Sequence, residues 1–230
     1  MDPDDWFSIL LGGQTSSEYA QERFRMTKED APGYARMREA AIVLGTWDDH
    51  DFGANDADRT FPLKDENREL FLDFIDEPED SERRMQKHTP IHQDYFVTKG
   101  SKTVHIILLD GRYEYDREPG DRLGSDQWEW LELAFKRGKQ RQVALTVIGS
   151  GTQVIPGSFQ AFYCEEFRTE SRMRLYKMMR ENEIGEVVII SGDVHFAKVY
   201  QASCSSLTGQ NQLLEFCSSG LSHVVSDWLY

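Results

Sequence analysis

The stretch "EVVIISGDVH" (186–195) combines an apolar run with a polar tip. The run of valine and isoleucine has the length and the β-branched composition of a buried strand. The tip offers Asp193 and His195, a hard oxygen and an imidazole nitrogen, and this pair suits Zn, Fe or Mn. The alternative is structural, with Asp193 capping a turn and His195 hydrogen-bonded at the rim. The triplet alone does not decide between the two.

Two further apolar runs end in the same way. They are "AAIVLGTW" (40–47), followed by Asp48, Asp49 and His50, and "TVHIILL" (103–109), followed by Asp110 and Arg112. Open α/β sheets place their ligand sites at the carboxyl ends of the strands. We therefore expect the three polar tips to meet at one edge of the sheet.

The acidic loop "GTWDDHDFGANDAD" (45–58) packs five aspartates into fourteen residues. Clustered carboxylates repel one another unless they are solvated, protonated or bound to a cation. An EF-hand that starts at Asp49 is excluded, because Gly53, Ala54 and Thr60 stand where that loop needs Asp or Asn, Gly and Glu. A solvated turn and the wall of a metal site both remain open.

Arg112 in "LLDGRY" (108–113) follows a predicted buried strand directly. A guanidinium group binds phosphate oxygens through two parallel hydrogen bonds, which would suit an anionic substrate. A salt bridge within the protein, for example to Asp110, explains the same residue equally well.

The remaining chain predicts alternating helices and strands. We expect one or two helices over 15–40 and further helices over 62–76 and 169–182. Another helix should follow an N-cap at Ser125, with Trp128, Leu131 and Phe135 on one face. The expected strands are a hairpin of 95–97 and 103–109, and single strands over 143–150, 186–191, 196–202 and 213–218. This mixture predicts an α/β sandwich with helices covering mixed sheets.

Bulk properties exclude several classes of protein. A chain of 230 residues favours one domain, 1–230. The formal net charge of −14 argues against a nucleic-acid or anionic membrane surface. No apolar run reaches the roughly 20 residues of a membrane-spanning helix, and the acidic start does not resemble a signal peptide. Three cysteines without C-x-x-C spacing favour buried free thiols.

Five segments carry a family resemblance. They are "GTWDDHDFGANDA" (45–57), "IILLDGRYEY" (106–115), "LGSDQWEWLE" (123–132), "IISGDVHFA" (189–197) and "FCSSGLSH" (216–223). In this order they resemble the PhoD-like alkaline phosphatases, a branch of the calcineurin-like metallophosphoesterases, over about residues 34–223. The resemblance implies a four-layer α/β/β/α sandwich with mixed sheets and two metal ions at the strand ends.

The resemblance also implies roles for individual residues. The implied metal ligands are Asp49, Asn55, Asp193 and His195. His50 would assist the leaving group, and Arg112 would clamp the phosphate. His223 would lie near the site and contribute to substrate binding. The implied reaction is hydrolysis of a small phosphate monoester or diester by a metal-activated hydroxide, with Ca and Fe, or Mn or Zn, as the two metals.

One part of the family pattern has no match here. Family members carry an earlier strand and a "GD" loop that supplies a metal-bridging aspartate, and nothing before Trp47 resembles it. We therefore expect the N-terminal strands of the fold to be missing. The alternative function is a catalytically impaired phosphatase remnant that acts as a binding module, because loss of a bridging carboxylate weakens metal binding.

Overall fold

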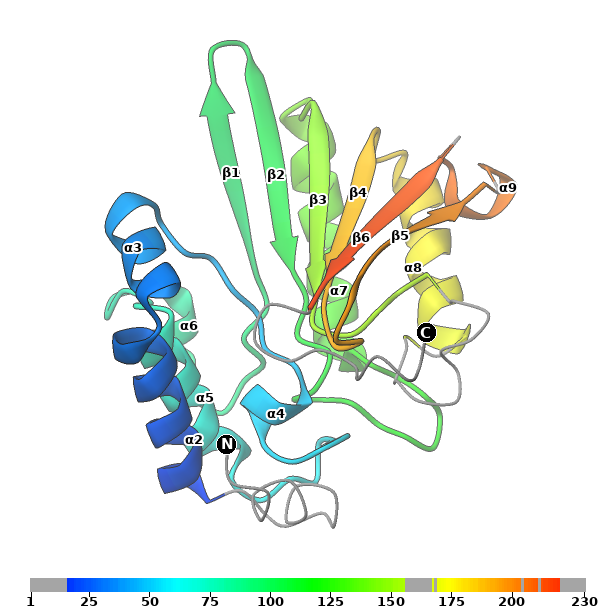
Figure 1. Ribbon diagram of the computed structural model, residues 1–230. Helices are drawn as coiled ribbons and strands as arrows, with labels where there is room; N and C mark the ends of the chain where they lie inside the picture. The colour runs from blue at the N-terminus through cyan, green and yellow to red at the C-terminus, as the bar shows by residue number, and fades with distance from the viewer. Residues whose placement is uncertain (1–15, 156–166, 168, 204, 211, 220–230) are drawn as a thin grey trace.

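The computed structural model describes residues 16–155, 167, 169–203, 205–210 and 212–219 (Figure 1). Its helices are α2 (Ser17–Arg25), the π-helical turn η1 (Met26–Asp30), α3 (Pro32–Ala40), α4 (Asp49–Phe52), α5 (Lys64–Phe74), α6 (Glu82–Met85), α7 (Gly124–Gln140), α8 (Thr169–Asn182) and α9 (Ser205–Thr208). Its strands are β1 (Gln93–Lys99), β2 (Lys102–Leu108), β3 (Leu145–Ser150), β4 (Val187–Ser191), β5 (Ala197–Ala202) and β6 (Leu213–Ser218).

The strands form one six-stranded mixed sheet in the order β1-β2-β3-β4-β6-β5. The four central strands β2, β3, β4 and β6 run parallel, while β1 and β5 are antiparallel edges. The β1–β2 hairpin turns at Gly100, whose φ of 62° suits glycine. The predicted α/β class, the hairpin and the later strands are therefore confirmed. The shared direction of the central strands brings their carboxyl ends to one edge.

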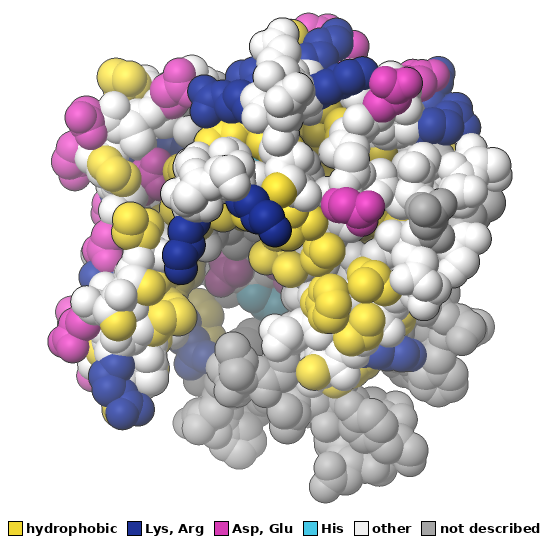
Figure 2. Space-filling view, turned by 90° about the horizontal axis from the view of Figure 1, so that it is seen from above, with side chains coloured by type: hydrophobic (Ala, Val, Ile, Leu, Met, Phe, Trp, Pro, Cys, Tyr) yellow, Lys and Arg dark blue, Asp and Glu magenta, His cyan; other side chains and the backbone are white. Residues whose placement is uncertain are grey.

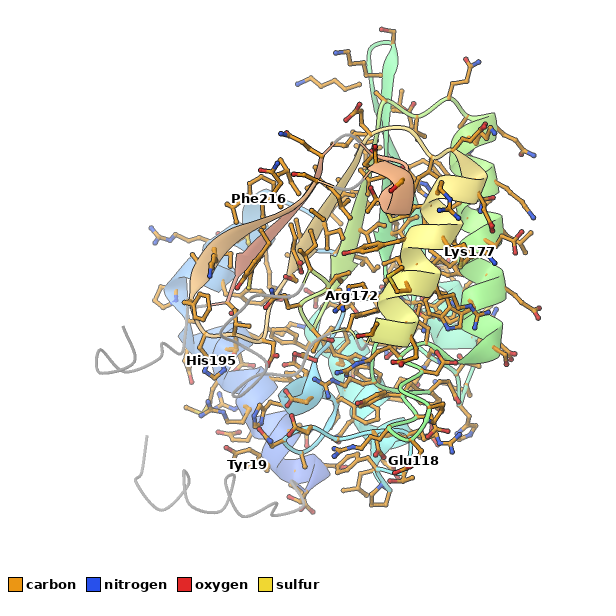
Figure 3. The ribbon with its side chains drawn as sticks, turned by 90° about the vertical axis from the view of Figure 1, so that its right-hand side faces the viewer. Tyr19, Glu118, Arg172, Lys177, His195 and Phe216 are labelled. Carbon is orange, nitrogen blue, oxygen red and sulfur yellow. The ribbon has the colours of Figure 1, made fainter. Side chains whose placement is uncertain are left out.

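Helices α7 and α8 cover one face of this sheet (Figures 1 and 3). The predicted stripe of α7, Trp128, Leu131 and Phe135, is buried in the same hydrophobic core as Ile148 and Ile189 of the sheet. Helix α7 begins at Gly124 and its N-cap residue is Leu123, so the predicted cap at Ser125 is wrong. None of the described helices covers the opposite face, and Phe216 lies on that side, away from α8 (Figure 3).

A second core lies beside the β1 edge of the sheet. Here α2 packs against α5, with Phe24 stacked on Phe74 at 4.9 Å between ring centroids. Trp47, Phe52 and Phe71 fill the centre of this core. The helical region expected over 15–40 is thus confirmed as α2, η1 and α3. One sheet of the expected four-layer sandwich is present among the described residues.

The predicted strand over 40–47 is wrong. Helix α3 continues to Ala40, and the extended segment after it belongs to no sheet. Ile42, expected to be buried, is 89% exposed. A strand is stable only when its N–H and C=O groups pair with a neighbour, and none of the described strands lies in register with this segment.

The free-thiol prediction can be checked at one cysteine. Cys217 is buried and free, as predicted. The other two, Cys164 and Cys204, lie outside the described residues.

Candidate metal centre

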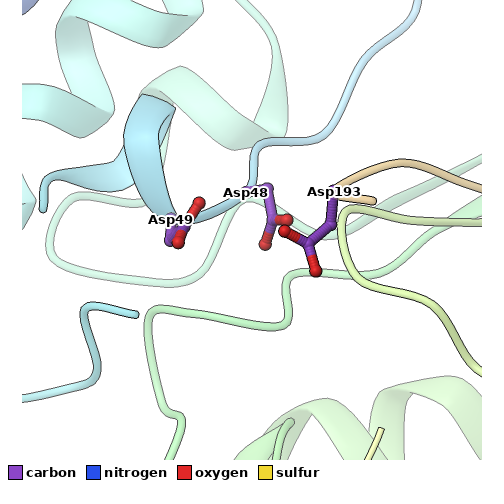
Figure 4. A group of neighbouring side chains, drawn as sticks. All are labelled: Asp48, Asp49 and Asp193. Atoms are coloured by element: carbon purple, nitrogen blue, oxygen red, sulfur yellow. The ribbon is translucent and has the colours of Figure 1, made fainter. Parts of the chain in front are cut away.

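Three aspartates from two distant loops meet at the carboxyl edge of the sheet (Figure 4). Asp48 and Asp49 stand at the start of α4, and Asp193 follows β4. One carboxylate oxygen from each lies within 4.8 Å of the other two. The prediction that the two polar tips converge is therefore confirmed for Asp49 and Asp193. The space-filling view shows a hollow with acidic and histidine side chains in its depth and hydrophobic groups near its rim (Figure 2).

The short helix α4 and its flanks hold Asp49 in place. Its Oδ1 accepts a hydrogen bond from the N–H of His50 at 2.8 Å, and its Oδ2 accepts one from the N–H of Asp56 at 2.8 Å. The N–H of Asp48 donates to Oδ2 of Asp51 at 3.2 Å. The acidic loop is thus an ordered turn built on its own carboxylates, and not a freely solvated one.

Arg112 pairs with Asp48. Its Nε donates to Asp48 Oδ1 at 2.7 Å, and its second terminal nitrogen lies 2.6 Å from the same oxygen. The guanidinium group is fully buried, at 0% exposure. The sequence left a phosphate contact and a salt bridge to Asp110 both open. The ion-pair partner is Asp48, while Asp110 accepts the backbone N–H of Arg112 at 2.9 Å. A direct phosphate contact stays a prediction.

The loop after β4 has an unusual backbone. Asp193 has a φ of 74° and His195 a φ of 58°, in the left-handed region that costs free energy for residues other than glycine. The N–H of His195 donates to Ser219 Oγ at 2.7 Å, which helps to hold the turn. His195 lies on the side of the sheet away from α8 (Figure 3). Its ring is outside the three-aspartate group, so its role as a ligand stays a prediction.

Gly151, just after β3, brings the two acidic loops together. A Cβ atom at this position would lie 2.3 Å from the carbonyl oxygen of Trp47 and 2.9 Å from Cβ of Asp48. The carbonyl oxygen of Gly151 accepts the N–H of Gly192 at 3.0 Å. Only glycine fits here, because the Trp47 backbone occupies the space that a side chain would need. The sequence signal for this contact is the pair of glycines, Gly149 and Gly151, at the end of the strand over 143–150.

Burial and neighbouring charges shift the pKa values of the acidic group. Burial, together with the charge of Asp49, raises the pKa of Asp48 to about 6, against the opposing effect of Arg112. Burial also acts to raise the pKa of Asp49, but Arg112, His50 and the two backbone N–H donors outweigh it, so this pKa is lowered. Burial raises the pKa of Asp51. A cation that binds Asp48 below pH 6 must therefore displace a proton.

The other predicted site residues lie as follows. His50 is exposed on α4, beside Asp49 in the chain. Asn55 is exposed in the turn after α4, next to the Asp56 N–H that Asp49 holds. His223 lies outside the described residues. Asp48, in the polar tip directly after Trp47, had no role assigned from the sequence, and the structure places its carboxylate in the three-aspartate group.

Comparisons with known proteins give a family and a related fold. Residues 13–227 match the model of a family described as PhoD-like phosphatase. Among solved structures, one entitled "Structure of PhoD" matches with a TM-score of 0.56 and 16% sequence identity, over 77% of this chain and 40% of that chain. At this identity the likeness shows the fold alone, and our chain spans less than half the length of that protein. A search of curated proteins gave no match.

Among the described residues, no helix is both long enough and apolar enough to cross a membrane.

Proposed function

Because this chain belongs to the PhoD-like phosphatase family, we propose that it hydrolyses phosphate esters with the help of bound metal ions. The observation that supports this proposal most directly is the meeting of Asp48, Asp49 and Asp193 at one edge of the sheet. Three carboxylates held this close repel one another, and a bound metal ion would offset the repulsion that the charge of Arg112 leaves. The substrate class in this proposal is a small phosphate monoester or diester.

The donor atoms of the three-aspartate group fit a hard metal ion. Carboxylate oxygens suit Ca²⁺ and Mn²⁺, and an added imidazole suits Fe or Zn. We propose that Asp48, Asp49 and Asp193 hold two metal ions, either Ca and Fe, or Mn or Zn, with His195 and Asn55 as further ligands. A bound ion would polarise water and offset the charge of the phosphoryl oxygens.

The residues around this group supply charge and protons in our proposal. Arg112 keeps Asp48 oriented through its two contacts, and its positive charge favours an anionic substrate nearby. His50 is exposed beside Asp49, where it can donate a proton to the leaving oxygen. His223 is our further proposal for substrate binding. We further propose that the six-stranded sheet is one of the two sheets of a four-layer α/β/β/α sandwich.

A second candidate function is a binding module without turnover. The open apolar face of the sheet favours it, because exposed apolar patches of this kind commonly mark interaction sites. The two functions differ in one measurable property, which is turnover of a phosphate ester by the metal-loaded protein.

Metal binding and turnover test this proposal together. We expect the protein supplied with Ca²⁺, Mn²⁺, Zn²⁺ or Fe ions to hydrolyse p-nitrophenyl phosphate or bis(p-nitrophenyl) phosphate. Asp193→Asn should lower both Mn²⁺ affinity and turnover by at least about 10-fold, because even loss of an outer contact to a metal ligand costs that much. Asp80→Asn, at an exposed loop position, is the matched control and should change neither.

The outcomes separate the candidates. Metal that raises the melting temperature without any turnover would favour the binding module, since a ligand of the folded state must stabilise it. A melting temperature unchanged by all four metals would contradict the proposed metal centre.

A further inference from the structure

Asp110 is a fully buried carboxylate just beyond the end of β2. Its Oδ1 accepts hydrogen bonds from Trp47 Nε1 at 2.7 Å, from the N–H of Arg112 at 2.9 Å and from the N–H of Tyr113 at 3.0 Å. Its Oδ2 accepts the N–H of Ile91 at 2.8 Å. These four donors are all uncharged N–H groups, and hydrogen bonds to an ionised acceptor are about twice as strong as neutral ones.

These contacts join the two segments that form the Asp48–Arg112 ion pair. Trp47 directly precedes Asp48, and its indole N–H is fixed by Asp110. The backbone of Arg112 is fixed by the same carboxylate oxygen. One atom of Asp110 therefore sets the distance between the segment that carries Asp48 and the segment that carries Arg112.

Helix α7 holds Asp110 in turn. Gln127, which is buried, accepts the N–H of Asp110 through Oε1 at 2.9 Å and donates through Nε2 to its carbonyl oxygen at 2.8 Å. This pairing uses both backbone polar groups of Asp110. The position of its carboxylate is thus tied to the helix layer that covers the sheet.

We propose that Asp110 is a positioning residue for the metal centre, which it serves through Trp47 and the Asp48–Arg112 pair. It does not belong to the three-aspartate group itself. The inference rests on the proposed function, because Asp48 is there a metal ligand. An Asp48 side chain that is free to turn would spend less of its time in a ligating position, and the loss would appear as weaker metal binding.

The test variant is Asp110→Asn, which keeps the shape but turns one acceptor into a donor facing N–H groups. We expect the Mn²⁺ dissociation constant of the folded protein to rise by about 10- to 100-fold. Leu131→Ala is the control for a merely structural effect: it removes a buried side chain of α7, lowers the melting temperature, and should leave the Mn²⁺ dissociation constant unchanged. Both are measured well below the melting temperature of each variant.

A second readout needs no metal. In the wild type, the Arg112 Nε–H is buried and bonded to Asp48, so its NMR resonance should exchange slowly with water. In Asp110→Asn that exchange should be at least about tenfold faster, but not in Leu131→Ala. If Asp110→Asn does not fold, Trp47→Phe removes the single indole donor, and we expect the same changes at smaller size.

The two readouts separate the inference from the proposed function. If the Arg112 Nε–H exchanges with water as slowly in Asp110→Asn as in the wild type, the positioning role is overturned, whatever the Mn²⁺ dissociation constant. Wild-type protein that binds none of Ca²⁺, Mn²⁺, Zn²⁺ or Fe ions overturns the proposed metal centre, while the exchange experiment still decides whether Asp110 orients the Asp48–Arg112 pair. Equal losses of Mn²⁺ affinity in Asp110→Asn and Leu131→Ala would show a structural effect only and would also overturn the inference.

Discussion

The two faces of the sheet carry similar apolar side chains but have very different surroundings. On the face covered by α7 and α8, Ile148 and Ile189 have no exposed surface. On the other face, the neighbouring side chains Ile190, Phe216 and Val199 are 44%, 43% and 58% exposed. Register places Phe216 beside both of the others, so they form one continuous apolar patch. Apolar composition alone therefore does not determine burial, since the layer packed against each face does.

The largest expected effect comes from the adjacent isoleucines of β4. Ile189→Ala should lower the free energy of unfolding by about 2–5 kcal/mol, because it leaves a cavity under the helices. Ile190→Ala, one residue along on the open face, removes the same atoms from a partly solvated site and should cost less than half as much. Urea unfolding measures both. Equal losses of unfolding free energy in Ile189→Ala and Ile190→Ala would show that the face with Ile190 is also covered in solution.

An intermediate effect is expected at Glu215, which points into the covered face. Its Oε1 accepts the N–H of Val154 at 2.8 Å, and its Oε2 accepts the N–H of Ile155 at 2.5 Å. Glu215→Gln places an amide donor against one of these N–H groups and should cost about 1–3 kcal/mol in unfolding free energy. The exposed Glu129 of α7 serves as the reference for loss of a charge, and Glu129→Gln should have almost no effect. If Glu215→Gln leaves the free energy of unfolding unchanged, this buried contact is ruled out.

The smallest effect is expected on the open face. Val199→Thr keeps the β-branched shape and changes an exposed methyl group to a hydroxyl, so the unfolding free energy should change by no more than about 0.5 kcal/mol. Binding of a hydrophobic fluorescent dye should nevertheless fall, because the apolar patch becomes smaller. Undiminished dye fluorescence would place the dye elsewhere and refute the patch as the main exposed apolar surface.

The sequence predicted the parts of the fold whose signal is local. The strands that became β2, β3 and β4 contain runs of β-branched and other apolar residues, and the stripe of Trp128, Leu131 and Phe135 repeats with the helical period. The run over 40–47 has the same composition but no partner among the described strands, and a single sequence cannot reveal whether a partner is present. Composition predicts that a segment can form a strand, but whether it does depends on a neighbouring strand to pair with.

The candidate site was predictable to a similar extent. The sequence predicted that Asp49 and Asp193 would meet at neighbouring strand ends. The two do meet, but only Asp193 follows a strand, since the segment before Asp49 belongs to no sheet. The pairing of Arg112 with Asp48 was not predictable, since it depends on a contact across 64 positions of the chain. The role of Gly151 depends on the path of the Trp47 backbone, which no local pattern records.

The absence of a side chain at Gly151 has a mechanical consequence. The turn before α4 and the turn after β4 both rest on the same peptide, one by direct contact and the other by a hydrogen bond to its carbonyl. Because both turns contact the Gly151 peptide, we expect their thermal motions to be coupled. The acidic groups should therefore loosen as a unit on heating, and a wedge as small as one methyl group would separate them.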